Sequence, residues 1–194
     1  MTGLLGPARA DETPPPPKKA SDFTLKDLDG KDRKLSEFEG KWVVLEWTNY
    51  DCPFVKKHYL AEHKQMQGLQ KKYTDKGVIW LSICSSAPGK QGNKSPEEWK
   101  KAIADNGAAP TAVLLDTDGK VGKDYGARNT PEIWIVNGKR EIAYHGAADD
   151  TPDWHADVTK AKNYIVAVLD AVLDGKEAPV KETKPYGCSI KYAE

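Results

Sequence analysis

Short apolar runs and amphipathic stretches alternate along the middle of the chain. Residues 42–48 (WVVLEWT) and 78–84 (VIWLSIC) are rich in β-branched and aromatic side chains, which predicts buried strands. Three further runs of strand type follow them: TAVLLD at 111–116, EIWIV at 132–136 and EIAYHG at 141–146. Strands of this number and kind indicate a central sheet.

Helices are predicted where apolar residues recur every three or four positions. The first begins after Cys52-Pro53 and continues as one helix to Gly77. The second begins at a capping box around Ser95, and the third carries its apolar stripe over residues 161–172. The strands that these helices join are expected to pair in parallel.

Turn signals complete the prediction of the fold class. Residues 23–35 contain two half-apolar runs around Asp29-Gly30, which is typical of a hairpin near the N-terminus. An Asn137-Gly138 turn makes the last pair of strands antiparallel. The sequence therefore predicts an α/β fold with a mixed central sheet flanked by helices.

Composition narrows the function classes. The chain has 194 residues, which suits one domain, and its 29 basic and 29 acidic residues give a net charge of zero. That balance argues against a nucleic-acid partner, and no run approaches the roughly 18 apolar residues of a membrane span. Three cysteines are too few for a scaffold built from disulfides.

The two ends differ from the middle. Residues 1–20 combine the A-x-A spacing of Ala8 and Ala10 with a proline run, which predicts a signal-peptide remnant and a Pro-rich linker. This implies a periplasmic or secreted protein; the alternative is an ordinary N-terminus of a cytoplasmic one. Residues 21–175 are expected to form the domain, on which the irregular tail at 176–194 docks.

Cys52 is the first candidate for chemistry because a proline follows it at the start of a helix. As the helix N-cap, its sulfur is expected to lie near free backbone N–H groups and the helix dipole, which favour a thiolate. Lys56, Lys57 and His58 are expected to add positive potential, whereas Asp51 opposes it. The alternative is a buried, inert cysteine.

Glu46 is a carboxyl group inside the buried run WVVLEWT. Burial raises the pKa of such a group, which makes Glu46 a candidate acid/base near neutral pH. The alternative is an ion pair between Glu46 and a lysine at the edge of the sheet.

Three segments carry a family resemblance. Residues 43–55 (VVLEWTNYDCPFV) resemble the active-site segment of thioredoxin-fold proteins, and the span from about 21 to 172 resembles the redoxin group. That group includes the alkyl-hydroperoxide-reductase/thiol-specific-antioxidant family. SSAPGKQG at 85–92 and PYGCSIKY at 185–192 are similar to a peroxiredoxin-like subgroup. The resemblance implies a thioredoxin fold and thiol chemistry without a cofactor.

The resemblance also implies roles for individual positions. Cys52 matches the first, nucleophilic cysteine of the thioredoxin C-x-x-C motif, but Val55 stands where the second cysteine would be. Glu46 matches the buried acid that relays protons to and from the cysteine pair. Thr130 and Pro131 match the threonine and cis-proline that face the nucleophile and bind the backbone of the substrate.

The peroxidase pattern of the family is incomplete. Peroxiredoxins carry P-x-x-x-T-x-x-C, whereas this chain has Leu45 and Asn49 at the proline and threonine positions. Arg128 is expected to approach the thiolate, but it does not occupy the position of the family's assisting arginine. We therefore interpret three residues as modulators of the nucleophile: Asn49, Asp51 and Arg128. The resemblance supports thiol peroxidase activity less well than it supports thiol–disulfide exchange.

A second sulfur has to replace the missing cysteine. Cys188 in the tail is the first candidate and Cys84 is the second, and the sequence leaves all three pairings open. With a working Cys52–Cys188 pair, the protein is a thiol–disulfide oxidoreductase for a protein or small-molecule thiol or disulfide. With a permanent Cys52–Cys188 bond, it is a non-catalytic binding module.

Histidines supply weaker candidates. A metal site of Cys52, His58 and His63 is not expected, because the two histidines are five residues apart on different faces of a helix. The polar residues after the last predicted strand are expected to form a solvated loop: His145, Asp149, Asp150 and His155.

Overall fold

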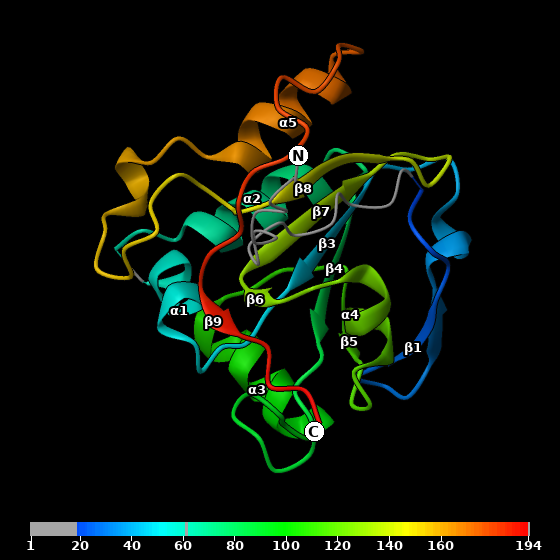
Figure 1. Cartoon of the computed structure of the whole chain (residues 1–194), viewed down its shortest axis with the longest axis vertical. Helices are drawn as coiled ribbons and strands as arrows, with labels where there is room; N and C mark the ends of the chain where they lie inside the picture. The colour runs from blue at the N-terminus through cyan, green and yellow to red at the C-terminus, as the bar shows by residue number, and fades with distance from the viewer. Residues whose placement is uncertain (1–18, 61, 194) are drawn as a thin grey trace, which may run out of the picture.

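A mixed sheet forms the centre of the computed structural model, which describes residues 19–60 and 62–193. The predicted signal-peptide remnant and proline run therefore lie outside the described residues. The sheet has seven strands in the spatial order β2-β1-β5-β4-β3-β7-β8 (Figure 1). Their bounds are β1 Thr24–Asp27, β2 Asp32–Lys34, β3 Val43–Trp47, β4 Ile79–Cys84, β5 Ala112–Leu115, β7 Glu132–Val136 and β8 Ile142–Gly146.

Pairing within the sheet follows the predicted pattern. The adjacent strands β3, β4 and β5 run parallel, and β7 and β8 pair antiparallel across the Asn137-Gly138 turn. β1 pairs antiparallel with both β2 and β5, so the hairpin extends the sheet at one edge. The predicted α/β fold with a mixed central sheet and a hairpin near the N-terminus is confirmed.

Helices cover both faces of the sheet. The bounds are α1 Pro53–Tyr59, α2 Gln65–Thr74, α3 Pro96–Asn106, α4 Lys120–Tyr125 and α5 Tyr164–Leu173, with 3-10 turns η1 Leu35–Phe38 and η2 Val158–Lys160. Side chains from α1, α2, α3 and α5 fill the core on one face, and those of α4 and η1 fill the core on the other. None of the described helices is long and apolar enough to cross a membrane.

The single long helix predicted after Cys52 is wrong, because two helices occupy this stretch. α1 ends at Tyr59, and Lys64, with a left-handed φ of 44°, precedes α2. Tyr59 and Met66 are seven residues apart, a spacing that two separate helices satisfy as well as one continuous helix does. Both are buried, whereas Glu62, which belonged to the predicted stripe, is exposed.

The C-terminal tail adds a second, two-stranded sheet that the sequence did not predict. β9 Cys188–Ser189 pairs antiparallel with β6 Asn129–Thr130. The N–H of Ile190 donates to the carbonyl oxygen of Arg128 at 2.9 Å, which extends this pairing. In Figure 1 the tail, drawn in orange and red, passes β6 and α1 before it reaches the C-terminus. Strands of two residues are too short to show a period in the sequence.

Candidate active site

Cys52 is the N-cap residue of α1, as predicted, and it is fully buried. Pro53 occupies the first turn of the helix, where its missing N–H costs no hydrogen bond. The thiol does not cap the helix: its Sγ lies 3.3 Å from the carbonyl oxygen of Thr130, to which it donates. The sulfur therefore faces the loop before β7, and the expectation that it contacts free N–H groups of the helix is wrong.

The loop opposite α1 contains a cis peptide bond between Thr130 and Pro131, which confirms the cis-proline that the resemblance implied. Thr130 is buried, and its backbone pairs with Cys188 of the tail. The side-chain amide of Asn129 donates to the carbonyl oxygen of Gly187 at 3.1 Å. These contacts hold the tail against the loop directly above Cys52.

The pairing of β6 with β9 brings two sulfurs together. The Sγ atoms of Cys52 and Cys188 lie 2.6 Å apart, and both residues are free cysteines in this structure. Burial, followed by the contact with Cys52, raises the pKa of the Cys188 thiol to about 12. Cys188 therefore keeps its proton near neutral pH while it touches the other sulfur.

Cys84 is not part of this pair. It is buried at the end of β4, and its thiol lies 3.4 Å from the carbonyl oxygen of Gly92, to which it donates. Burial raises the pKa of the Cys84 thiol, which favours its protonated form. All three cysteines lie in the described part of the chain, and the structure brings only Cys52 and Cys188 into contact.

Glu46 is fully buried in β3 and surrounded by neutral hydrogen-bond donors. The donors are the Tyr59 hydroxyl at 3.2 Å, the Gln70 amide at 3.2 Å, the Trp80 indole at 2.8 Å and the Ser82 hydroxyl at 3.1 Å. Burial raises the pKa of the Glu46 carboxyl group, and these hydrogen bonds oppose the rise. The predicted direction of the pKa is confirmed, and the alternative ion pair with a lysine is wrong.

A Glu46→Gln variant tests this pKa through the pH dependence of stability. The carboxyl group, whose ordinary pKa is 4.5, binds its proton more tightly when folded. The stabilisation that the protonated Glu46 adds to the free energy of unfolding is therefore fully present below pH 4.5. It is lost as the pH rises through the folded-state pKa. The glutamine of the variant does not titrate, so only the wild type loses this stabilisation. We therefore expect the variant to be less stable than the wild type at low pH, and the difference in free energy of unfolding to shrink as the pH rises. Denaturant titrations of both proteins at pH values from 4.5 upwards measure this difference in free energy of unfolding. A difference that grows with pH would contradict the raised pKa of Glu46.

The three predicted modulators occupy different places. Asn49 shapes the loop before Cys52, because its Oδ1 accepts the N–H of Asp51 at 2.9 Å and its carbonyl oxygen accepts the N–H of Cys52 at 2.9 Å. Asp51 forms an ion pair with Lys94 at 2.8 Å, which offsets its charge. Arg128 is exposed, and among the described contacts its guanidinium reaches neither cysteine.

Two of the three basic side chains of α1, those of Lys57 and His58, lie in a buried cluster, whereas Lys56 is exposed. Lys57 Nζ and His58 Nδ1 lie 3.9 Å and 3.8 Å from carboxylate oxygens of Asp149. Burial lowers the pKa of His58, which favours its neutral form. Asp149 offsets the charge of Lys57, so the expectation that Lys57 and His58 strengthen the positive potential at the nucleophile is wrong.

The loop after β8 also differs from the prediction. His145 belongs to β8 itself and is buried. In the loop that follows, Asp149 is buried, whereas Asp150 and His155 are exposed, so only part of this loop is solvated. Asp149 is buried because side chains of α1 and of the tail contact it, which sequence pattern does not reveal. Within residues 19–60 and 62–193, no group of three or more His, Cys, Asp and Glu side chains is placed to hold a metal ion.

Glu132, the first residue of β7, is a site residue that was not predicted from the sequence. Its Oε2 accepts the backbone N–H groups of Arg128 and Asn129 at 2.8 Å and 2.9 Å. Its Oε1 lies 2.8 Å from Nε2 of the buried His145. Glu132 thereby holds the backbone to which the tail binds. The available signal was a second carboxyl group inside a buried run, EIWIV.

The mixed sheet, the cysteine at the start of α1 and the cis-proline loop opposite it define a thioredoxin-fold protein. Residues 16–145 match the AhpC/TSA family, and the chain belongs to that family. The redoxin resemblance is thereby confirmed. Cys188 and the rest of the tail lie beyond the matched residues.

Individual relatives point to thiol chemistry. The chain is 30% identical over 125 residues to the thioredoxin-like protein YneN of Bacillus subtilis, covering 64% of this chain and 67% of YneN. It is 26% identical over 125 residues to the thiol-disulfide oxidoreductase ResA of Halalkalibacterium halodurans, covering 64% of each. It thus spans about two thirds of the length of these relatives. An uncharacterized conserved protein from Geobacillus kaustophilus has a similar crystal structure, with a TM-score of 0.81, 32% identity and 98% of both chains covered.

Proposed function

We propose that the protein is a thiol–disulfide oxidoreductase in which Cys52 is the nucleophile and Cys188 is its resolving partner. The observation that carries the proposal is the 2.6 Å separation of their Sγ atoms at the start of α1. Membership of the AhpC/TSA family and the similarity to ResA support the class of reaction. The substrate is the disulfide of a protein or of a small molecule.

Reduction of a substrate disulfide takes two steps. The Cys52 thiolate attacks one sulfur of the substrate, a mixed disulfide forms, and the other substrate sulfur leaves as a thiolate that takes up a proton. Cys188 then loses its proton and attacks the Cys52 sulfur, which forms the Cys52–Cys188 disulfide and releases the second substrate thiol. Both electrons come from the two cysteines, and an external dithiol restores the reduced protein.

Thr130 and Glu46 have proposed roles beside the cysteines. The backbone of Thr130 pairs with the tail, and the same edge holds the backbone of a substrate when the tail moves aside. The Tyr59 hydroxyl bonds to Glu46, and the Tyr59 ring packs 4.9 Å from that of Tyr50, two residues before Cys52. We assign Glu46 the role of an acid/base for the site, and its burial and raised pKa support that role.

A static disulfide is the second candidate, because Cys52 is fully buried beneath the tail. In that case the bond pins the tail, and the fold serves as a binding module. The thiol peroxidase alternative has less support, since Asn49 is occupied in shaping its loop. The periplasmic or secreted location predicted from residues 1–20 stays a prediction, and an oxidising compartment would suit either disulfide.

Equilibration in glutathione redox buffers, followed by peptide mapping without reductant, separates the two candidates. For a working pair we expect a Cys52–Cys188 bond that opens near about −200 mV, the range of catalytic disulfides. A bond that stays closed below about −300 mV would indicate a structural disulfide and would contradict the enzyme. Cys84 serves as the internal control, because its buried thiol is expected to remain unpaired throughout.

A further inference from the structure

A buried lysine and a buried aspartate lie under the tail, and the proposed reaction does not use them. The side chain of Lys57 is 1% exposed and that of Asp149 is 0% exposed, and their charged atoms lie 3.9 Å apart. Buried charges are costly unless they are paired and hydrogen-bonded. The groups that form hydrogen bonds with Lys57 and Asp149 therefore show which segments of the chain this pair holds together.

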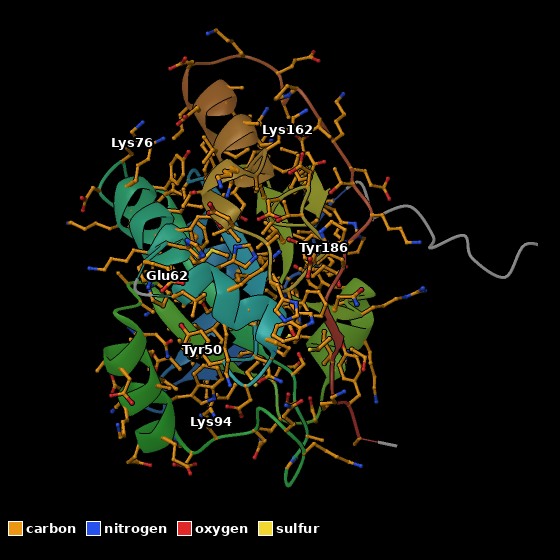
Figure 2. The ribbon with its side chains drawn as sticks, turned by 90° about the vertical axis from the view of Figure 1, so that its left-hand side faces the viewer. Tyr50, Glu62, Lys76, Lys94, Lys162 and Tyr186 are labelled. Atoms are coloured by element: carbon orange, nitrogen blue, oxygen red, sulfur yellow. The ribbon has the colours of Figure 1, made fainter. Side chains whose placement is uncertain are left out.

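Tyr186 of the tail contacts both charges. Its hydroxyl donates to Asp149 Oδ1 and accepts a hydrogen bond from Lys57 Nζ at 3.1 Å. The Lys57 ammonium also lies 4.8 Å from the centre of the Tyr186 ring, and the ring of Phe54 packs 6.0 Å from it. Figure 2 labels Tyr186 where the tail crosses the body of the molecule. Side chains of α1 and of the loop after β8 thus bind one tail residue together.

The other partners of the pair belong to the loop. Lys57 Nζ donates to the carbonyl and hydroxyl oxygens of Thr151 and to the carbonyl oxygen of Asp153. Asp149 Oδ1 accepts the N–H and O–H of Thr151 at 2.9 Å and 2.8 Å. Burial lowers the pKa of Lys57 although Asp149 opposes the change, so the ammonium benefits from each acceptor around it. Loss of the Tyr186 hydroxyl would remove one of these acceptors in a place that solvent does not reach.

The cluster is connected to both cysteines of the proposed pair. Lys57 lies on α1, the helix that Cys52 begins, so it moves with the nucleophile. Tyr186 precedes Cys188 by two residues, so its position sets where the second sulfur lies. The ion pair and its hydrogen bonds therefore hold the tail in place just before Cys188.

We propose that the Lys57–Asp149 pair positions Cys188 against Cys52 by binding the Tyr186 hydroxyl while both thiols are reduced. Tyr186 is a positioning residue, because it acts through the tail and does not touch the reacting atoms. This inference rests on the proposed redox pair. A thiol that is held in place has a high effective concentration, which favours closure of the intramolecular disulfide.

Tyr186→Phe tests the anchor. The variant keeps the ring and its contacts with Lys57 and Phe54, so the fold is expected to remain intact. A hydrogen bond between charged and neutral groups accounts for roughly ten- to hundredfold in an equilibrium constant. We expect the equilibrium constant for forming the Cys52–Cys188 disulfide from oxidised glutathione to fall about tenfold. In the reduced protein, amide hydrogen exchange at Ile190 should become faster by about the same factor.

Tyr192→Phe is the matched control, because the Tyr192 hydroxyl of the tail donates to an uncharged group, the carbonyl oxygen of Ala127 at 2.9 Å. In this variant we expect the equilibrium constant for forming the Cys52–Cys188 disulfide, and the exchange rate at Ile190, to change about threefold or less. An unchanged equilibrium constant in Tyr186→Phe, or an equal fall in both variants, would overturn the anchor. If the wild type forms no Cys52–Cys188 bond with glutathione, the proposed function fails, and exchange at Ile190 still tests the anchor by itself.

Discussion

The reduced Cys52→Ser variant is expected to release no glutathione when it is mixed with oxidised glutathione. The reduced wild type is expected to release two glutathione thiols for each disulfide that it reduces. A serine hydroxyl keeps its proton near neutral pH and has no sulfur to form a disulfide, so the first attack cannot occur. Cys188 does not replace Cys52, because burial raises the pKa of its thiol. Released thiol and protein mass, followed over time, measure the result. Glutathione release by this variant at the wild-type rate would contradict the role of Cys52.

Two further cysteine variants make that experiment specific. Cys84→Ser serves as the control, because the thiol of Cys84 contacts the carbonyl oxygen of Gly92 and not the pair, and it should behave like the wild type. Cys188→Ser should stop after the first step, with one glutathione bound to Cys52 and one released. A Cys188→Ser protein that releases both would show that Cys188 does not resolve the mixed disulfide.

Gly187→Ala is expected to have the second large effect, by displacing the tail. Gly187 has a φ of 126°, which side chains rarely adopt, and an added Cβ would overlap the carbonyl oxygen of Thr130. The Thr130 oxygen belongs to the backbone and the Cβ is bonded directly to the Cα, so neither atom can turn aside, and the segment that carries Cys188 has to shift. A displacement of about 1 Å can lower the rate at a reacting group about a hundredfold, and the effective concentration of the Cys188 thiol beside Cys52 falls with the same loss of alignment. We expect that loss in the equilibrium constant for closing the disulfide, measured in glutathione buffers.

Gly175→Ala is the matched control for the effect of the backbone. Gly175 also has a positive φ, of 75°, but nothing lies within 4 Å of an added Cβ. It should lower the free energy of unfolding by about 1–2 kcal/mol and leave the disulfide equilibrium unchanged. If Gly187→Ala closes its disulfide as readily as Gly175→Ala does, the contact between β6 and β9 does not position Cys188.

Much of the fold was predictable because its central strands are long enough to carry a pattern. β3 and β4 are apolar runs bounded by turns, and a buried position in a sheet requires such residues. The boundary between α1 and α2 was not predictable, because Tyr59 and Met66 keep a helical spacing across the break. α4 and β6, with six and two residues, are too short for a period to show.

The candidate site divides in the same way. Cys52 at the start of a helix and Glu46 inside a strand were visible locally, since each departs from the composition around it. Cys188 was visible as a candidate but not as a contact, because the choice between it and Cys84 depends on where a 19-residue tail lies. The pair of Lys57 with Asp149 is formed by segments far apart in the chain, so its local sequence resembles that of solvated residues. Glu132 differs, because it begins the apolar run EIWIV.

The sequence by itself determined the α/β class, the order of the central strands along the chain, the cysteine at the helix N-terminus and the carboxyl group inside the strand before it. These features depend on residues that are close together in the chain, and short-range patterns record them. Only the tertiary structure decided which sulfur faces Cys52 and what holds it there. The Cys52–Cys188 contact joins residues 136 positions apart, and pairing over such a distance follows from packing and buried polar contacts rather than from any local pattern.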